Sequence, residues 1–310
     1  MIKGYLGVDV GSVSTNLVVI DDQNQLLVEQ YLRTNGKPIQ TVQEGLHAIG
    51  QDLPADVQIA GAATTGSARY LTSLIIGADI VKNEITAHAI ASSALAEDVK
   101  TIIEIGGQDS KIIILREGVV TDFAMNTVCA AGTGSFLDQQ ASRLLISIED
   151  FGSYALKAKN PVRIAGRCAV FAESDMVHKQ QLGYNTEDII AGLCEALVRN
   201  YMNNVGKGKE ILAPVMFQGG VAANEGLVRA FNRYLGQEVI VPRHYGVMGA
   251  SRKKGGTSFK GFNIQEIHFK TRSFECKGCS NACEVVQFYE NSELLARWGD
   301  RCGKWELHVM

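Results

Sequence analysis

The sequence predicts an α/β protein made of two similar domains, and three observations indicate this. A strand–turn–strand–turn–strand pattern opens the chain and recurs from Thr101 onward. Sequence with helical periodicity follows each copy, as an alternation of strands and helices requires. A third apolar strand, Ala213–Val221, ends in two glycines before another helix. We therefore expect a first domain at residues 1–100, a second at residues 101–252 and an extension at residues 253–310.

The first copy predicts three short strands, because apolar and β-branched runs are bounded by Gly, Asp, Asn and Ser. The strands are expected at Tyr5–Val10, Leu17–Ile20 and Leu26–Tyr31, with turns at Gly11–Ser14 and Asp21–Gln25. Helices are expected to follow at Pro38–Gln51 and Asn83–Glu97.

The second copy repeats this arrangement, and LGVDVGSVSTNLVVI resembles IIEIGGQDSKIIIL in pattern. Its elements are expected as strands at Thr101–Ile105, Lys111–Leu115 and Val119–Ala124 and helices at Gly134–Leu145 and Ala169–Gln181. After the third apolar strand we expect a helix at Asn224–Leu235, a strand at Glu238–Val241 and a helix around Gly249. Beyond Arg252 the composition changes, and KKGGTSFKG is typical of a linker.

Composition excludes several functional classes. With 310 residues, 46% of them hydrophobic, the chain is long enough to bury a full core. The formal charge is -3 and Lys and Arg are not clustered, so the sequence shows no basic patch for binding nucleic acid or an anionic membrane. The start, MIKGYLGVDVG, does not match a secretory signal, and no run reaches the ~18 apolar residues of a membrane span, so a cytoplasmic protein is expected. In that reducing compartment the seven cysteines indicate thiol or metal chemistry.

Two glycine-containing turns, Asp9–Thr15 and Gly106–Ser110, are predicted to bind phosphate groups. Glycine lets backbone N–H groups approach anionic oxygens without interference from a Cβ. Asp9 can hold a Mg²⁺ ion through its waters, and Asp109 can do the same or orient the attacking water, so both are predicted to be catalytic. The predicted phosphate-binding residues are Gly11, Ser12, Ser14, Thr15, Gly106, Gly107 and Gln108.

A third glycine loop, Gly219-Gly220, is predicted to lie against the nucleoside, together with Asn224. Any one of these loops taken alone also fits an ordinary hairpin turn. The chain has neither a Walker A sequence nor a G-x-G-x-x-G opening a helix after the first strand. The order of the three loops instead resembles the superfamily of actin, sugar and acetate kinases and heat-shock chaperone ATPases. That resemblance implies a duplicated fold that binds ATP or ADP with Mg²⁺ in a cleft between the two domains.

Two cysteines each fall just before a predicted helix: Cys129 in MNTVCAAGTGSFLDQQASRL and Cys168 in IAGRCAVFAESDMVHKQQLG. The free N–H groups and partial positive charge of a helix N-terminus favour a thiolate or an anionic cluster beside it. Two thiolates are half of what a [4Fe-4S] cluster needs, and a symmetric dimer would supply the other half. Spacing alone leaves open that both are buried small apolar residues.

The segments CAAGTGSFLD, CAVFAESD, IGGQDSK and QGGVAANEG resemble the ATP-dependent activator family of 2-hydroxyacyl-CoA dehydratases and the ATPase subunits of benzoyl-CoA reductase. The resemblance covers about residues 3–252. It implies a homodimer with one [4Fe-4S] cluster bridging Cys129 and Cys168 of both subunits, and helices whose angle changes with the nucleotide. It also implies a partner iron–sulfur dehydratase, reductase or double-cubane-cluster protein, and an electron donor such as ferredoxin or flavodoxin.

Three other residues of the core have less specific interpretations. Cys194 falls in an amphipathic helix and is expected in the core, and His178 is expected at the surface or in packing. Glu173 is left open between bonding the following backbone and acting near the nucleotide.

The extension carries Cys276, Cys279 and Cys283 in a C-x-x-C-x-x-x-C pattern, followed by Cys302. Four cysteines at these spacings indicate a metal site, either Zn²⁺ or a second iron–sulfur cluster, with free thiols as the alternative. The pattern differs from the bacterial ferredoxin run. Short activators of the family end near the adenosine-side helix, so this extension departs from them and resembles longer, multidomain relatives.

Two other functions compete with ATP-driven electron transfer. A small-molecule kinase acting on amino sugars would need a sugar-binding carboxylate between the domains and would not depend on Cys129. A non-redox, ATP-dependent conformational switch would be colourless and would tolerate loss of both Cys129 and Cys168. No residue in the sequence indicates the substrate of the acceptor protein.

Overall fold

The computed structural model describes residues 1–96, 98–126, 129–166, 168–244 and 257–308, which form two compact units. Unit 1 comprises Met1–Gly11, Thr15–Val81 and Ala250–Met310, and unit 2 comprises Ser12–Ser14 and Lys82–Gly249. The division after Val81 differs from the expected boundary at residue 100, because helix α3 (Glu84–Leu95) packs on the second sheet. The helix expected around Gly249 and the first part of the expected linker lie outside the described residues.

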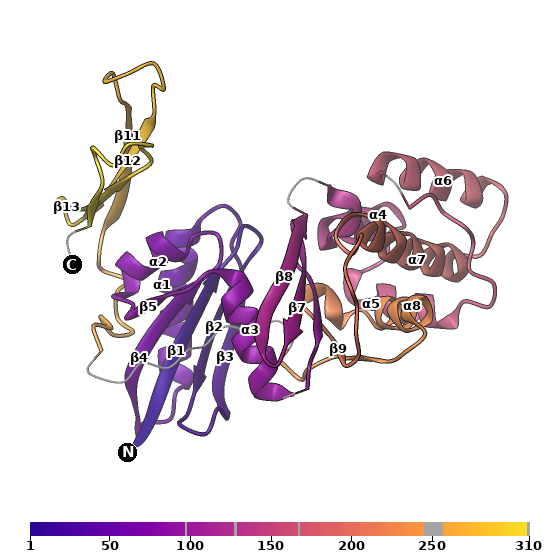
Figure 1. Ribbon diagram of the computed structural model, residues 1–310, viewed down its shortest axis with the longest axis horizontal. Coiled ribbons are helices and arrows are strands. Elements are labelled where there is room, and N and C mark those ends of the chain that lie inside the picture. Colours follow the sequence, from indigo (N-terminus) through magenta and orange to yellow (C-terminus); the bar gives the residue numbers. More distant parts are fainter. Residues whose placement is uncertain (97, 127–128, 167, 245–256, 309–310) are drawn as a thin grey trace. The chain divides into compact units, whose positions relative to one another are not determined.

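Unit 1 is built on a five-stranded sheet whose order is β3-β2-β1-β4-β5 (Figure 1). Its strands are β1 (Ile2–Val10), β2 (Ser14–Ile20), β3 (Leu26–Arg33), β4 (Val57–Thr65) and β5 (Ile80–Val81). Strand β1 is antiparallel to β2 and parallel to β4. Two helices, α1 (Pro38–Asp52) and α2 (Arg69–Ile76), bury their apolar side chains against β1 and β2 in one core.

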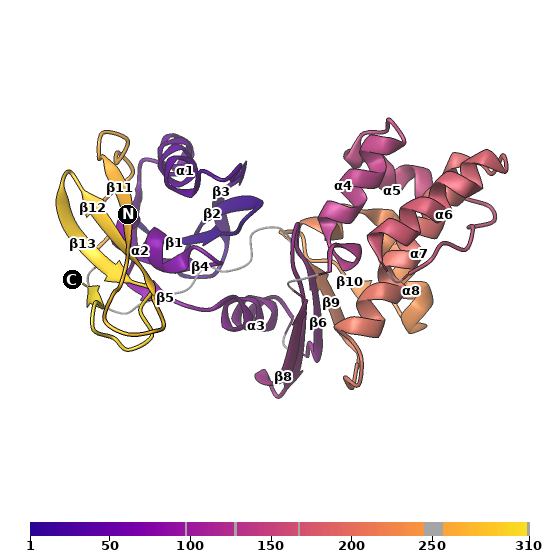
Figure 2. The ribbon, with the colours of Figure 1, turned by 90° about the horizontal axis from the view of Figure 1, so that it is seen from above.

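Unit 2 repeats this topology with the order β10-β9-β6-β7-β8. Its strands are β6 (Thr101–Ile105), β7 (Ser110–Arg116), β8 (Val119–Asn126), β9 (Val215–Gln218) and β10 (Val239–Ile240). Helix α3 covers one face through Ala89, while helices on the other face form the larger core (Figure 2). These helices are α4 (Gly134–Arg143), α5 (Ile148–Lys157), α6 (Ala169–Gln181), α7 (Thr186–Asn204) and α8 (Glu225–Leu235), with short 3₁₀ turns η1 (Ala130–Gly132) and η2 (Gly220–Ala223).

The duplication extends to the strand register. Val10 pairs with Thr15 across the first hairpin, and Ile105 pairs with Ser110 across the second, so both turns have the same length. The counterpart of Asp9 is therefore Glu104, one residue before the hairpin-closing pair. The predicted duplicated α/β fold is confirmed by this shared strand order and register.

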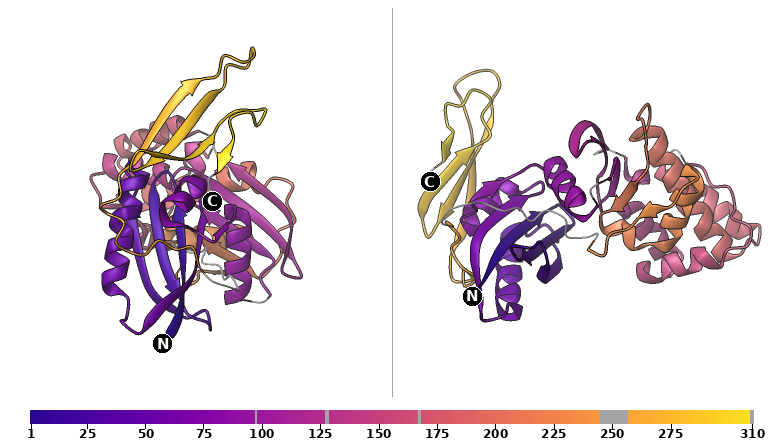
Figure 3. Two further views of the ribbon diagram at one scale, coloured as in Figure 1. Left: turned by 90° about the vertical axis from the view of Figure 1, so that its left-hand side faces the viewer. Right: turned by 60° about the horizontal axis from the view of Figure 1, so that its bottom comes forward.

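The extension forms a four-stranded antiparallel sheet that belongs to unit 1 and shares its hydrophobic core (Figure 3). Phe288 and Ala296 are buried in the core of unit 1, and Gln43 of α1 donates hydrogen bonds to the carbonyls of Ile264 and Ile267. The strands are β11 (Phe269–Glu275), β12 (Glu284–Glu290), β13 (Glu293–Trp298) and β14 (Leu307–His308). Among the described residues, no helix combines the length and the apolar character that crossing a membrane requires.

Candidate functional site

The turn between β6 and β7 is the second predicted phosphate loop, and it is bonded directly to helix α4. The Gly106 N–H closes the turn on the Asp109 carbonyl at 3.0 Å. Gly134 N–H donates to the Gly106 carbonyl at 2.8 Å. Ser135 donates to the Gly107 carbonyl through its N–H at 2.8 Å and its hydroxyl at 2.6 Å. Three hydrogen bonds therefore join this loop directly to the first turn of α4.

The third glycine loop begins where β9 ends and packs on the end of β6. Gly219 has a φ of +91°, and a Cβ there would lie 2.4 Å from the Ile105 carbonyl oxygen and 2.8 Å from Glu104 Oε1. Only glycine fits such a position. In the same loop, a Val221 methyl lies 2.9 Å from where a Cβ on Gly134 would be. The two glycine loops of unit 2 and the start of α4 thus converge on one region.

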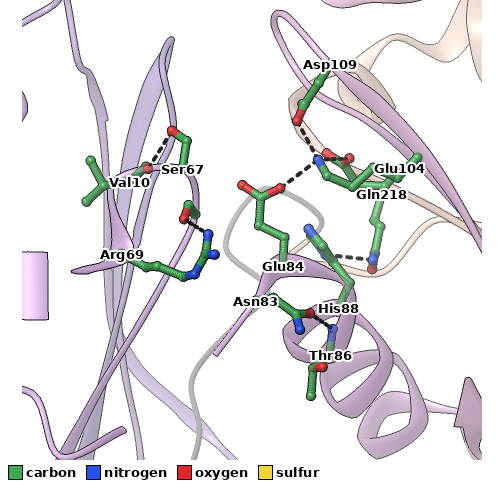
Figure 4. A network of polar contacts seen from close by, with 12 residues as sticks. Val10, Ser67, Arg69, Asn83, Glu84, Thr86, His88, Glu104, Asp109 and Gln218 are labelled. Atoms are coloured by element: carbon green, nitrogen blue, oxygen red, sulfur yellow. Dashed lines mark hydrogen bonds and ion pairs between the residues drawn. The ribbon is translucent and has the colours of Figure 1, made fainter. Parts of the chain in front are cut away.

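A buried lysine lies at the base of the second phosphate loop. Lys111 Nζ contacts three carboxylates: Glu104 and Asp109 at 2.9 Å and Glu84 at 3.1 Å (Figure 4). Burial alone would lower the pKa of Lys111, but the three carboxylates together raise it well above its usual range. Burial raises the pKa of the Glu104 carboxyl, and Lys111 opposes that shift. The charged lysine fixes Asp109, the predicted catalytic residue of the turn, to β6, β7 and the start of α3.

Beside this cluster, the buried His88 of α3 is hydrogen-bonded to Gln218 at the end of β9 (Figure 4). Gln218 Nε2 lies 2.9 Å from His88 Nδ1, and the Ser92 hydroxyl donates to Gln218 Oε1 at 3.2 Å. Burial, and next the Lys111 ammonium, lower the pKa of His88 to about 4. A neutral imidazole therefore accepts the Gln218 amide and ties α3 to the strand that leads into the third glycine loop.

The lowered pKa of His88 predicts a loss of stability in acid. Protonation favours the unfolded chain, so the stabilisation is complete above the ordinary value of 6.5 and is lost as the pH falls toward about 4. Between about pH 7 and pH 5, this group should lower the free energy of unfolding by about 2 kcal/mol. Urea unfolding at both pH values measures it. His88→Gln should lose this part of the pH dependence, whereas the control His178→Gln, at an exposed site, should keep it. Identical pH dependence of stability in wild type and both variants would contradict the assignment of this effect to His88.

The first predicted phosphate loop, between β1 and β2, is supported by two buried threonines. The Thr34 hydroxyl donates to the Gly11 carbonyl at 3.0 Å and lies 3.0 Å from the Thr15 hydroxyl. Thr15 is fully buried, so its hydroxyl shapes the turn, whereas Ser12 is exposed and Ser14 half-buried. Of the predicted hydroxyl donors, Ser12 is the most accessible to a ligand.

Asp9 lies near the end of β1, beside the loop that follows β4. Gly66 begins this loop with a φ of +90°, and a Cβ there would lie 2.4 Å from Asp9 Oδ1 and 2.5 Å from the Val10 carbonyl oxygen. The Ser67 hydroxyl donates to the same Val10 carbonyl at 3.3 Å (Figure 4). The loop after β4 therefore packs closely against the Asp9 carboxylate.

Both cysteines that precede predicted helices are helix N-caps in unit 2. Cys129 caps η1, which leads into α4, and is half-buried, while Cys168 caps α6 and is exposed. Asn126 at the end of β8 accepts a hydrogen bond from the Cys129 N–H at 2.9 Å and donates to the Cys129 carbonyl at 2.8 Å. These two bonds fix the backbone of Cys129 to the sheet.

One side chain of α7 contacts both cysteine segments. Asn200 Nδ2 donates to the carbonyl of Gly166, two residues before Cys168, at 3.3 Å. Asn200 Oδ1 lies 3.0 Å from where a Cβ on Gly132 would be, in the turn that Cys129 caps. Asn200 therefore links the two cysteine segments across the end of α7.

Glu173, whose role the sequence left open, joins α6 to α4. Its carboxylate lies 2.7 Å from Arg143 Nη2 and 3.1 Å from Gln139 Nε2. The helix that Cys168 caps is thus tied to the helix that follows Cys129. The other two interpreted residues lie as expected, with His178 exposed and Cys194 buried in the core of unit 2.

Comparison with known proteins shows the family. The sequence model of the BadF/BadG/BcrA/BcrD ATPase family matches residues 6–251. The chain belongs to this family. The (R)-2-hydroxyglutaryl-CoA dehydratase activating ATPase of Acidaminococcus fermentans is 33% identical over 258 residues, which cover 79% of this chain and 95% of that protein. The activator of lactoyl-CoA dehydratase of Anaerotignum propionicum is 31% identical, with 79% and 95% covered.

A solved structure supports the same relationship. The activator of the 2-hydroxyisocaproyl-CoA dehydratase from Clostridium difficile, with bound ADPNP, has a TM-score of 0.72 and 30% identity to this chain, and covers 78% of this chain and 89% of that one. The expected family and fold are therefore confirmed. The region matched by the family model contains both phosphate loops, the third glycine loop, Cys129 and Cys168, and it ends before the C-terminal cysteines.

The family core brings together only some of the predicted site residues. Gly106, Gly107, Gln108, Asp109, Gly219 and Gly220 all belong to unit 2, around the start of α4. Asn224, by contrast, caps α8 by accepting a hydrogen bond from the Leu227 N–H at 3.1 Å. Its predicted contact with the cofactor stays a prediction. The residues that sequence reasoning missed are Glu84, His88, Glu104, Lys111 and Gly66.

Gly66→Ala tests whether the placement of Asp9 matters to this ATPase. The new Cβ would overlap Asp9 Oδ1 and the Val10 carbonyl, so the carboxylate must move. We expect ATP hydrolysis to fall about 100-fold, as displacing a catalytic group by about 1 Å can do. Gly36→Ala is the control, because Gly36 also has a positive φ, +70°, but no neighbour within 4 Å of the added Cβ. Steady-state phosphate release measures both variants, and equal activities would contradict the prediction.

The four C-terminal cysteines lie outside the matched region and differ in exposure. Cys276 is buried, Cys283 is half-buried, and Cys279 and Cys302 are exposed. Trp305 Nε1–H donates to Cys276 Sγ at 3.1 Å. That bond, followed by one from the Gly278 N–H, lowers the pKa of Cys276. In the described parts of the chain, no three Cys, His, Asp or Glu side chains converge closely enough to form a ready metal site.

Proposed function

We propose that this ATPase is an ATP-driven, one-electron donor that activates a partner iron–sulfur dehydratase or reductase. In this proposal a homodimer holds one [4Fe-4S] cluster through Cys129 and Cys168 of each subunit. Family membership and the named activator relatives support the activator role. The bound nucleotide would be ATP or ADP with Mg²⁺, and the electron would come from a donor such as ferredoxin or flavodoxin.

The observation that carries the proposal is the direct connection between the phosphate loop and the Cys129 turn. Gly134 and Ser135 bind the loop carbonyls of Gly106 and Gly107, and Cys129 lies in the 3₁₀ turn immediately before them. A γ-phosphate that draws the loop toward itself would pull the first turn of α4. The thiol of Cys129 would then move with the nucleotide state.

Contacts between α4, α6 and α7 extend this coupling to Cys168. Glu173 on α6 bonds Arg143 and Gln139 on α4, and Asn200 on α7 contacts the segments around both cysteines. The two thiols are therefore held by one connected set of side chains. A nucleotide shifts such an element only as far as it binds the two conformations differently.

The residues present fit an iron–sulfur cluster at this place. Each cysteine occupies the N-cap position of a helical segment, Cys129 of the short turn η1 and Cys168 of α6, and the start of a helix favours negative charge nearby. One chain offers two such thiols, and four are the usual ligand set, which accounts for the proposed dimer. When bound, the cluster supplies one-electron redox chemistry. The chain itself binds the nucleotide, and Asp9 and Asp109 are proposed to hold Mg²⁺ and orient the attacking water.

Iron and sulfide analysis of anaerobically purified protein tests the proposal. Wild type should contain about four iron and four sulfide ions per two chains. Cys168→Ala should lose this iron, whereas Cys194→Ala, which removes a thiol from the core of the same unit, should keep it. An iron-free wild type would favour a kinase or a non-redox switch. Cys168→Ala with unchanged iron would also contradict the proposal.

A further inference from the structure

We propose that the C-terminal extension holds one Zn²⁺ ion in a four-thiolate structural site made by Cys276, Cys279, Cys283 and Cys302. The inference does not depend on the proposed electron-transfer function, because these residues lie in the loops of the C-terminal sheet, beyond the residues matched by the family model. Tetrahedral coordination by four thiolates is the usual ligand set of structural zinc.

Cys276 and Cys283 lie opposite each other at the end of the β11–β12 hairpin. The last strand pair is Glu275 with Glu284, and the Cys276 N–H donates to the Cys283 carbonyl at 2.8 Å, so the antiparallel register continues by one pair. Directly opposed residues in such a pair have Cα atoms about 5.5 Å apart and side chains on the same face. These two thiols are therefore already neighbours.

Cys279 lies in the turn that joins these two opposed cysteines. The Gly278 N–H bonds the Cys276 sulfur, which curls the chain back after two residues, and the Ala282 N–H donates to the Cys279 carbonyl at 3.3 Å. Cys279 is exposed, so its side chain can rotate without displacing packed atoms. A C-x-x-C turn of this kind is the usual source of two zinc ligands.

The fourth cysteine is brought near by Trp305. The indole N–H bonds Cys276 Sγ at 3.1 Å, and the ring packs edge-on against Phe274 with centroids 5.1 Å apart. The Trp305 backbone N–H also binds Asp300, which closes the loop that carries Cys302. Cys302 lies three positions before Trp305, a span of at most about 10 Å. In this structure the Cys302 thiol lies 3.5 Å from an Asp300 carboxylate oxygen, so completing the proposed site requires this exposed thiol to turn toward the other three.

Positive charge and hydrogen-bond donors around the cysteines suit a zinc–thiolate site. Four thiolates around Zn²⁺ carry a net negative charge, and Lys277, Arg301 and Lys304 directly flank or follow the cysteines. Lys304 Nζ lies 3.7 Å from where a Cβ on Gly278 would be, beside the turn. The Trp305 and Gly278 N–H groups donate to sulfur, as outer-shell partners of metal-bound thiolates do. Binding would release the remaining thiol protons to solvent.

Metal analysis of the full-length protein, purified anaerobically without added chelator, tests the site. We expect about one zinc per chain, and loss of that zinc in each of Cys276→Ser, Cys279→Ser, Cys283→Ser and Cys302→Ser. The double variant Cys129→Ser, Cys168→Ser should keep its zinc, so failure here and failure of the proposed cluster are separate results. Zinc retained in all four single variants would overturn the site.

A second measurement covers the case in which the cysteine variants do not fold. Co²⁺ added to zinc-stripped wild type should give the thiolate-to-metal absorption of tetrahedral coordination, and one equivalent of Zn²⁺ should remove it. Trp305→Phe keeps all four thiols but loses the indole N–H, and should bind zinc about 10- to 100-fold more weakly. No cobalt spectrum, or iron and sulfide in place of zinc, would overturn the proposal.

Discussion

Replacing Lys111 with methionine is expected to destabilise unit 2 by about 3–5 kcal/mol. The lysine is buried and neutralises Glu84, Glu104 and Asp109, and its removal leaves carboxylates in a poorly solvated site. Asp109 would also lose the contact that fixes it beside the phosphate loop, so nucleotide hydrolysis should fall together with stability. Urea unfolding gives the free energy directly, and phosphate release gives the activity.

Lys209→Met is the matched control for that experiment. Lys209 also forms an ion pair, with Asp122 at 2.7 Å, but the Asp122 side chain is 52% exposed. Water replaces an exposed partner at little cost. The control should therefore lose much less stability than Lys111→Met. Similar losses of stability in the two variants would contradict the prediction that burial makes the Lys111 cluster costly to disrupt.

Gly219→Ala is expected to destabilise the protein by about 3 kcal/mol and to weaken nucleotide binding at least about tenfold. The added Cβ would overlap the backbone carbonyl of Ile105, which cannot move without distorting β6, and the φ of +91° is unfavourable for alanine. Since the same loop contacts the start of α4, the predicted adenosine site would be distorted. Unfolding in urea and calorimetric titration with ADP measure the two effects.

Gly236→Ala separates the effect of close packing from the effect of the positive φ. Gly236 ends α8 with a φ of +67°, but nothing lies within 4 Å of the added Cβ. This control should lose only the cost of the positive φ, about 1 kcal/mol, and should bind ADP normally. If Gly219→Ala behaved like Gly236→Ala, close packing at the third glycine loop would not explain the requirement for glycine.

The strands flanking the two phosphate loops could be predicted because each copy combines apolar runs with a glycine-containing turn. Strand β4, Val57–Thr65, was missed because its inner half, AGAATT, has small residues instead of the β-branched runs that signal a strand. Pairing with the central β1 makes it a strand. Helix α2 follows directly and was missed for another reason, because its eight residues are too few to establish a helical period.

Long-range contacts explain the missed site residues. Lys111 looked like the polar start of an apolar strand. Glu104 pairs with it across the β6–β7 hairpin and Asp109 lies in the hairpin turn, but Glu84 comes from α3, which no local spacing connects to Lys111. Gly66 could have been found by following the duplication one strand further. Asp9 pairs with Thr65 as Glu104 pairs with Gln218, so the glycine after β4 is the counterpart of Gly219, and both have φ near +90°.

Cys129 and Cys168 show what the sequence can predict and what it cannot. Local patterns placed Cys129 and Cys168 correctly before helical segments, and the structure makes each an N-cap. The connection between them runs through Asn200 on α7 and through Glu173 on α6, which pairs with Arg143 on α4. No periodicity predicts that connection, because it depends on how α4, α6 and α7 pack.

The proposed coupling of nucleotide to the Cys129 and Cys168 thiols is tested most directly by electron paramagnetic resonance of the anaerobic, dithionite-reduced protein before and after MgATP is added. We expect a signal from one reduced [4Fe-4S] cluster whose shape changes with MgATP, because Gly134 and Ser135 join the phosphate loop to the Cys129 turn. A protein without such a signal, or a signal that MgATP leaves unchanged, would contradict the account.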